Sequence, residues 1–233
     1  MTSSVKTQGI ILTRTNFGEA DRILTFITPD HGKIKAIAKA VRKSQSKLAG
    51  GIELFSVSNL TVISGRRDIC TIISTRLVKH YGRIVEDTNR TNLAYDFMRL
   101  INKNTEDAAD GGYFRLLEKA LQALDDPKLD AGLVNLWFEM QLLKLAGHAP
   151  NLHSDVKGNK LTDSNSYDFT HEGMHFVPKS TKEGRFGADH IKFLRLGFAA
   201  EGPGVLARVQ DAEKISESVQ PLLQNMLKSY ARV

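Results

Sequence analysis

The chain has 233 residues, of which 41% are hydrophobic and 25% charged, a composition typical of a folded globular protein. Its single cysteine, Cys70, excludes an internal disulfide and a zinc site built from several cysteines. The sequence has no signal peptide and no run of eighteen apolar residues, so we expect a cytoplasmic protein with no membrane segment. The formal net charge is +6, but residues 1–80 carry thirteen basic and five acidic residues, so the excess charge belongs to the N-terminal third and favours a polyanionic partner there.

The first eighty residues have the pattern of five short strands separated by turns. Asn16-Phe17-Gly18 and Pro29-Asp30-His31-Gly32 supply turn residues between the first three apolar runs. The predicted strands cover residues 9–15, 22–28, 33–41, 54–63 and 69–78. Five short antiparallel strands in fewer than ninety residues predict a small closed barrel, and the five-stranded oligonucleotide-binding (OB) type is the common solution.

Beyond Tyr81 the apolar period changes from two to about 3.6, which predicts helices. Apolar positions from Leu93 to Ile101 and from Phe114 to Leu124 indicate two of them, the first capped at Thr88 or Thr91. A third helix is expected from near Asp130 to Ala146, with Gly147 ending it.

Residues 148–187 lose this period and are expected to form an irregular loop or a small hairpin. A short helix from His190 to Phe198 and a terminal amphipathic helix, kinked or restarted at Pro221, should follow. The predicted fold class is therefore α+β: an OB-type barrel over residues 1–80, then a helical domain over 81–233 with a loop-rich insert at about 148–187.

The segment from Lys33 to Lys47 contains six basic residues and no acid. If residues 33–41 form a strand, alternation places three lysines on one face, together with Ile37 and Val41, and the alanines on the other. Such a face suits phosphate groups; the alternative is a solvated edge strand whose lysines prevent pairing with other edges. The candidate phosphate-binding residues are Lys33, Lys35, Lys39, Arg42, Lys43 and Lys47, extended by Arg14, Arg22, Arg66, Arg67, Arg76 and Lys79.

Aromatic and catalytic signals are weak. Phe17 and Phe55 could stack on a nucleobase, but both are expected in the core, so binding should be led by phosphates and have little sequence preference. No nucleophile elbow, phosphate-binding glycine loop or Cys-x-x-Cys pair occurs, so we expect no enzyme activity and no cofactor. His171 and His175 have a spacing seen in zinc sites, but surface histidines in a loop are the simpler interpretation, and no metal site is predicted.

The N-terminal sequence GIILTRTNFGEADRILTFITPDHGKIKAIAKAVRKSQSKLAGGIELFS resembles the start of the bacterial RecO family. There an apolar strand, a GE.DR turn, a T..HGK turn and a basic strand and loop recur in this order. Downstream, LVNLWFEMQLLKLAGHAPNL resembles the helix of that family that ends at a glycine before a proline-containing loop. The resemblance covers roughly residues 5–155.

The resemblance implies a nucleoid-associated DNA repair and recombination mediator with an OB-fold and a helical domain. Such a protein binds single- and double-stranded DNA, anneals complementary strands and works with RecR, the tail of the single-strand DNA-binding protein and, indirectly, RecA. Many members bind zinc through four cysteines in the insert; this chain has none there, with Asp155 near the first expected position, so zinc is not expected. Two alternatives stay open: an RNA-binding barrel, and an interaction scaffold that binds no nucleic acid.

Overall fold

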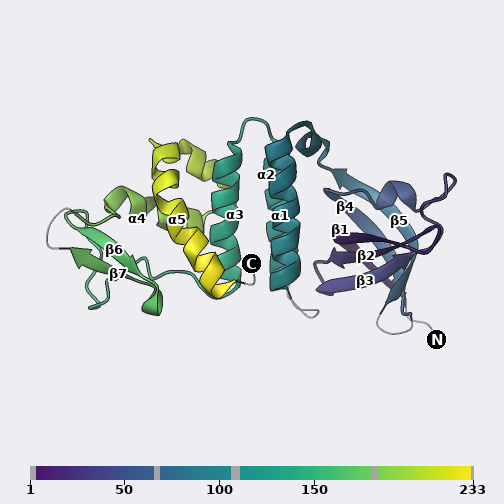
Figure 1. The fold of residues 1–233 in the computed structure, drawn as a ribbon, viewed down its shortest axis with the longest axis horizontal. Coiled ribbons are helices and arrows are strands. Elements are labelled where there is room, and N and C mark those ends of the chain that lie inside the picture. Colours follow the sequence, from purple (N-terminus) through teal and green to yellow (C-terminus); the bar gives the residue numbers. More distant parts are fainter. Residues whose placement is uncertain (1–3, 66–68, 106–110, 180–182, 232–233) are drawn as a thin grey trace. The chain divides into compact units, whose positions relative to one another are not determined.

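The computed structural model describes residues 4–65, 69–105, 111–179 and 183–231, in which five strands come first and helices follow, with a two-stranded hairpin between the third and fourth α-helices (Figure 1). It confirms the predicted α+β class. The chain divides into two compact units, Met1–Pro127 and Lys128–Val233. The first two helices therefore share a unit with the barrel, whereas the sequence interpretation placed a domain boundary near residue 80.

Five strands of the first unit form a closed barrel in the order β1-β2-β3-β5-β4 (Figure 1). Neighbouring strands are antiparallel except β3 and β5, which pair in parallel over two residues. The strands are β1 (Ser4–Phe17), β2 (Asp21–Ile27), β3 (Lys33–Ala38), β4 (Ser56–Ile63) and β5 (Cys70–His80). This is the closed arrangement that the alternating apolar pattern predicted.

Small and large side chains alternate across the barrel interior. Leu24, Phe26, Ala36 and Ala38 are all fully buried in one apolar cluster. Gly9 belongs to this packing because a Cβ there would lie 2.6 Å from Leu60 Cδ1, closer than side chains pack. The core therefore fixes which face of each strand points inward, and so which face is left for function.

The strand ends differ from the prediction by up to five residues, and two of these differences affect the candidate site. β1 continues through Phe17, so the turn is at Gly18–Ala20, where Gly18 has a φ of +57°. β3 ends at Ala38 because Ala40 adopts a left-handed conformation (φ +53°), held by its N–H, which donates to Oδ1 of Asp21 (2.7 Å). The chain direction changes there, and Val41 is buried in the core. The prediction that Val41 shares a face with the lysines was therefore wrong.

Helices α1 (Thr88–Asn104) and α2 (Gly112–Asp125) complete the first unit. The cap of α1 is Asp87, whose Oδ1 accepts the N–H of Arg90 (2.8 Å), so the prediction of Thr88 or Thr91 was wrong. α1 packs against β1. Ile10 and Ile27, paired across β1 and β2 next to the inward pair Ile11 and Phe26, are nonetheless completely buried. Helix packing thus covers part of the outer barrel surface.

The second unit is built around α3 (Ala131–Leu145), which packs against α4 (Ala188–Ala199) and α5 (Ala212–Tyr230). Its predicted limits are confirmed, since the Asp130 carboxylate caps the helix and Gly147 follows it with a φ of +81°. Trp137 Nε1 donates to the carbonyl of Ala200 (3.0 Å), so this tryptophan is a core residue. Pro221 lies inside α5 and does not end it.

The insert contains a hairpin of β6 (Ser166–Thr170) and β7 (His175–Lys179), the second of the two predicted possibilities. Three buried aromatic residues, Tyr167, Phe176 and Phe186, form a small core with edge-to-face contacts. None of the helices in the described parts of the chain combines the length and the apolar character needed to cross a bilayer.

Candidate nucleic-acid interface

One face of the β1-β2-β3 sheet points away from the barrel core and remains accessible. The register pairs Thr13 with Thr25 and Thr25 with Lys35, so these three side chains form one row across three strands. The next row along the strands begins at Thr15, and Phe17 closes the series at the end of β1. We call the following set the outer strand face: Thr13, Thr15, Phe17, Ile23, Thr25, Lys35 and Ile37. None of them is buried.

The basic segment after β3 lies at the β1–β2 turn. Arg42 donates its backbone N–H to the carbonyl of Ala20 (2.9 Å), and its Nη1 donates to the carbonyl of Gly18 (3.4 Å). Leu48 and Ile52 pack against the barrel core, so the loop is anchored at both ends. We call the exposed cations of this strand and loop the basic cluster: Lys35, Lys39, Arg42, Lys43 and Lys47.

Lys33 does not belong to the basic cluster. Its Nζ donates to the carbonyl of Asn102 in the last turn of α1 (3.1 Å), and its side chain is half-buried. It pairs with Ile27, which lies in the row that α1 covers. A lysine there stabilises a helix C-terminus, so the strand alternation placed it on the right face but missed the helix above it.

Arg14 and Arg22 occupy the other face of the β1–β2 hairpin, in rows that continue into the core residues Leu24 and Ala38. Arg22 Nε donates to Oδ1 of Asn16 (3.1 Å). Because β1 and β2 extend beyond the core at this end, both arginines stay accessible there. They flank the hairpin tip and do not share the strand face of Lys35.

The remaining predicted cations lie elsewhere or outside the described residues. Arg76 is exposed on β5, paired with Asn59 of β4, on a different side of the barrel from β2. Lys79 donates to Oε1 of Gln122 (3.0 Å) and lies over the ring of Tyr81. Arg66 and Arg67 fall outside the residues that the structure describes.

The two candidate aromatic residues separate. Phe55 is buried and meets the ring of Tyr95 edge to face at 5.1 Å, as expected of a core residue. Phe17 is 53% exposed, so its assignment to the core was wrong. The hint in the sequence was its place directly before the Gly18-Glu19-Ala20 turn, where the strand extends past the packed core.

Acidic groups near the outer strand face are few. The carboxylate of Asp21, opposite Phe17, accepts the N–H of Ala40 and thereby fixes the end of β3. Glu19 is exposed in the turn beside it. The local balance of the hairpin tip and basic cluster therefore stays strongly positive.

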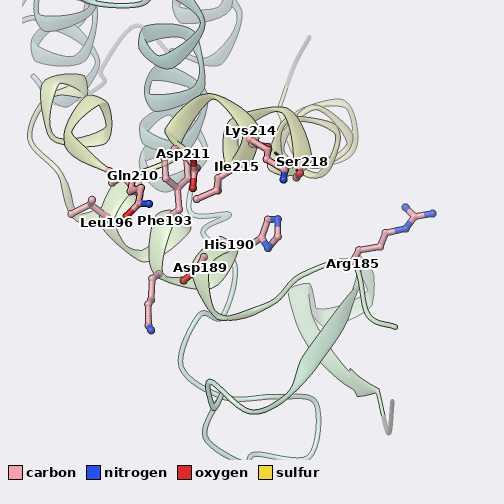
Figure 2. A pocket seen from close by; sticks show the side chains of 12 residues that line it. Arg185, Asp189, His190, Phe193, Leu196, Gln210, Asp211, Lys214, Ile215 and Ser218 are labelled. Atoms are coloured by element: carbon pink, nitrogen blue, oxygen red, sulfur yellow. Dashed lines mark hydrogen bonds between the residues drawn. The ribbon is translucent and has the colours of Figure 1, made fainter. Parts of the chain in front are cut away.

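The second unit has a pocket of about 720 Å³ between α4, α5 and the segment that precedes α5 (Figure 2). Phe193 and Ile215 supply apolar surface, while Lys214 faces it from α5. Burial lowers the pKa of His190, against the opposing effect of Asp189, which favours the neutral form of its imidazole.

The charges around this pocket nearly cancel. Lys192 is paired with Asp163 at 2.8 Å, and the cations of Arg185 and Lys214 are matched by the carboxylates of Asp189 and Asp211. A surface of this kind suits a partly apolar peptide better than a phosphate backbone. The basic cluster on the barrel is therefore the better nucleic-acid candidate.

Metal-ligating residues do not gather within the described ranges, where no three histidine, cysteine, aspartate or glutamate side chains are arranged to hold an ion. Asp155 instead organises the turn where a zinc loop would begin. Its Oδ1 accepts the N–H groups of Lys157 (2.8 Å) and Asn159 (2.9 Å). Burial opposes ionisation of this carboxyl, but these hydrogen bonds and the nearby Lys157 charge hold its pKa below the ordinary value.

A closed five-stranded barrel that presents a basic strand and loop, followed along the chain by helices, defines an OB-type barrel protein. The family models agree: Recombination protein O N terminal matches residues 1–81, and Recombination protein O C terminal matches residues 85–232. The chain belongs to the RecO family of DNA repair proteins, as its N-terminal motifs predicted.

Individual relatives give the same result. A DNA repair protein RecO of Dehalococcoides mccartyi is 31% identical over 217 residues, which cover 91% of this chain and 85% of that protein. The RecO of Alkaliphilus metalliredigens is 30% identical over 71% of this chain and 67% of its own length, and that of Desulfatibacillum aliphaticivorans is 34% identical over 65% and 60%. The chain therefore has a role in DNA repair and recombination.

Proposed function

We propose that the protein binds single- and double-stranded DNA through the basic cluster, anneals complementary strands and assists recombinase loading together with RecR, without covalent chemistry of its own. The observation that carries this proposal is the basic cluster itself. Five exposed cations stand on β3 and on the loop that follows it, which is anchored to the barrel at both ends. Such a fixed array neutralises neighbouring phosphates and releases their counterions.

Annealing follows from the same electrostatics. Two complementary strands repel each other through their phosphates, and a protein that neutralises several phosphates of one strand lowers that repulsion. Contacts of this kind carry no sequence information, which suits a protein that must act on any broken DNA. The exposed threonines of the outer strand face can add hydrogen bonds to the backbone without reading bases.

We infer that the second unit docks two protein partners, RecR and the tail of the single-strand DNA-binding protein. RecA would be affected only indirectly. The apolar residues and nearly balanced charges of the pocket between α4 and α5 support a peptide ligand in that place.

Charge reversal tests the basic cluster. Lys35→Glu, Lys39→Glu and Lys43→Glu change three exposed side chains and leave the core and the Lys33 contact to α1 intact. Affinity should fall for every DNA sequence tested. The slope of log affinity against log salt on single strands should flatten by about 0.7 for each phosphate that is no longer neutralised, or about 2 in total. Annealing of labelled complementary strands, bare or coated with single-strand DNA-binding protein, should slow in parallel.

The matched control reverses three exposed cations of the second unit: Lys160→Glu, Arg208→Glu and Lys228→Glu. It makes the same change in net charge and should leave the salt slope unchanged. If both triple variants lost DNA affinity equally, the loss would be an effect of net charge, and the basic cluster would have no special role in binding. Competition between matched DNA and RNA oligomers separates DNA binding from an RNA-binding role, because only RNA offers 2′-hydroxyl groups.

A further inference from the structure

We propose that Phe17 is a base-stacking residue: the ring at the tip of the β1–β2 hairpin takes an unpaired nucleobase, while the basic cluster holds the backbone of the same strand. This inference rests on the proposed DNA binding and adds to it a specific preference for bases that are not paired. Its chemistry is that of single-strand binding in general, in which aromatic faces hold bases and cations follow the phosphates.

The first support is the exposure of the ring. Phe17 is 53% exposed, and among the described residues every other phenylalanine is buried or half-buried. No other aromatic ring in the described parts of the chain stacks on it, whereas Phe55 and Phe169 each have an aromatic partner. A large apolar ring left in water at a hairpin tip contributes little to folding, and its exposed surface is available to a planar ligand.

The second support is the position of the ring relative to the cations. Phe17 and Thr13 are four residues apart on the same face of β1, which at about 3.3 Å per residue is about 13 Å. Thr13 begins the row that ends at Lys35, two strands away. A single strand crossing the outer strand face therefore meets the ring at one end and a lysine at the other.

The third support is the rigidity of the hairpin tip. The last pair of the β1–β2 ladder is Phe17 with Asp21, and the Asp21 carboxylate is itself bonded to Ala40. Arg42 donates to the carbonyls of Gly18 and Ala20, the first and last residues of the turn. The tip is therefore fixed to the start of the basic loop, and a preorganised aromatic ring loses little conformational entropy when it binds a base.

Together these features give the two halves of a single-strand site on one continuous piece of the barrel. A paired base has its faces covered by its neighbours in the duplex, so the ring gains contact only with a single strand, a duplex end or a bulge. The proposal thus gives the protein a physical means to favour the unpaired regions at which annealing begins.

The experiment uses the full chain with Phe17→Trp. Trp137 is the only native tryptophan and is 2% exposed, so the added indole reports on the hairpin tip. We expect a single-stranded thymidine oligomer to quench the fluorescence of Phe17→Trp, and an abasic oligomer of equal length and charge to leave it unchanged. The native chain, which carries Trp137 alone, should show no quenching with either.

Affinity gives the second readout. Phe17→Ala should bind the thymidine oligomer about tenfold more weakly than the native chain, while its salt slope and its affinity for the abasic oligomer stay the same. Phe17→Trp should retain native affinity. Phe17→Leu keeps an apolar side chain of similar size but has no aromatic face, so it should behave like Phe17→Ala; a loss confined to alanine would assign the effect to hairpin structure and overturn the proposal.

The outcomes separate the two proposals. If the native chain binds the thymidine and abasic oligomers equally, with no quenching of Phe17→Trp and no loss in Phe17→Ala, stacking is refuted while backbone binding stands. If none of the variants binds either oligomer, the proposed DNA binding fails and the stacking role fails with it. Weaker binding of the thymidine oligomer alone by Phe17→Ala and Phe17→Leu, together with quenching, supports the stacking role.

Discussion

Glu139 gives the protein a stability that depends on pH, and Glu139→Gln should remove that dependence. This carboxyl lies on α3, is 7% exposed, and is surrounded along the helix by buried apolar residues. Oε1 accepts a hydrogen bond from Asn135 Nδ2 (3.1 Å), while Oε2 has no partner among the described residues. Burial raises its pKa to about 7, against the opposing effect of the Asn135 hydrogen bond.

The direction and size of the effect follow from the two states. The unfolded pKa is 4.5, so between pH 4.5 and about 7 the folded state holds a proton that the unfolded state releases. The free energy of unfolding therefore falls as pH rises through this window, and the full loss is present above pH 7. A difference of about 2.5 pKa units at about 1.4 kcal/mol each gives at most about 3 kcal/mol. Glutamine keeps the acceptor for Asn135 and carries no charge.

The assay is urea unfolding of the native chain and of Glu139→Gln at pH 5 and pH 8.5, followed by the fluorescence of Trp137 on the same helix. From pH 5 to pH 8.5, the free energy of unfolding of the variant relative to that of the native chain should rise by about 1–3 kcal/mol. Comparing the two proteins removes the contribution of every other titrating group. If the free energies of unfolding of the two chains changed equally between the two pH values, the conclusion that folded Glu139 keeps its proton at pH 5 would be refuted.

Two further predictions concern the insert. The turn of the insert is organised by Asp155 and its core by aromatic side chains, so the purified protein should contain far less than one equivalent of zinc. A chelator should leave the melting temperature of the protein unchanged. Stoichiometric zinc whose removal unfolds the insert would contradict this prediction. Asp155→Ala should speed amide hydrogen exchange at Lys157 and Asn159 and leave the barrel unaffected. Since the folded pKa of Asp155 is lowered, acidification through that pKa should have the same local effect on the native chain, whereas protection that persists in both cases would exclude the carboxylate as the organiser of the turn.

Local patterns in the sequence determined much of the fold. The alternation of strands β2 and β4 and the apolar spacing of α3 could be predicted because each signal lies within its own element. The limits of α3 were also predictable, since the Asp130 cap and the Gly147 stop act on their immediate neighbours. The family resemblance was carried by short motifs of the same local kind.

Contacts between distant residues decided the candidate site. β3 ends where it does because a carboxylate of β2, nineteen residues earlier, binds the N–H of Ala40, and this buries Val41. Lys33 leaves the basic surface because its partner, the carbonyl of Asn102, is 69 residues away at the end of a helix. Phe17 is exposed because the barrel core ends before the hairpin tip, and where a core ends depends on how all five strands close around it. The sequence by itself determined which residue types are available for binding, and the closure of the barrel determined which of them remain accessible.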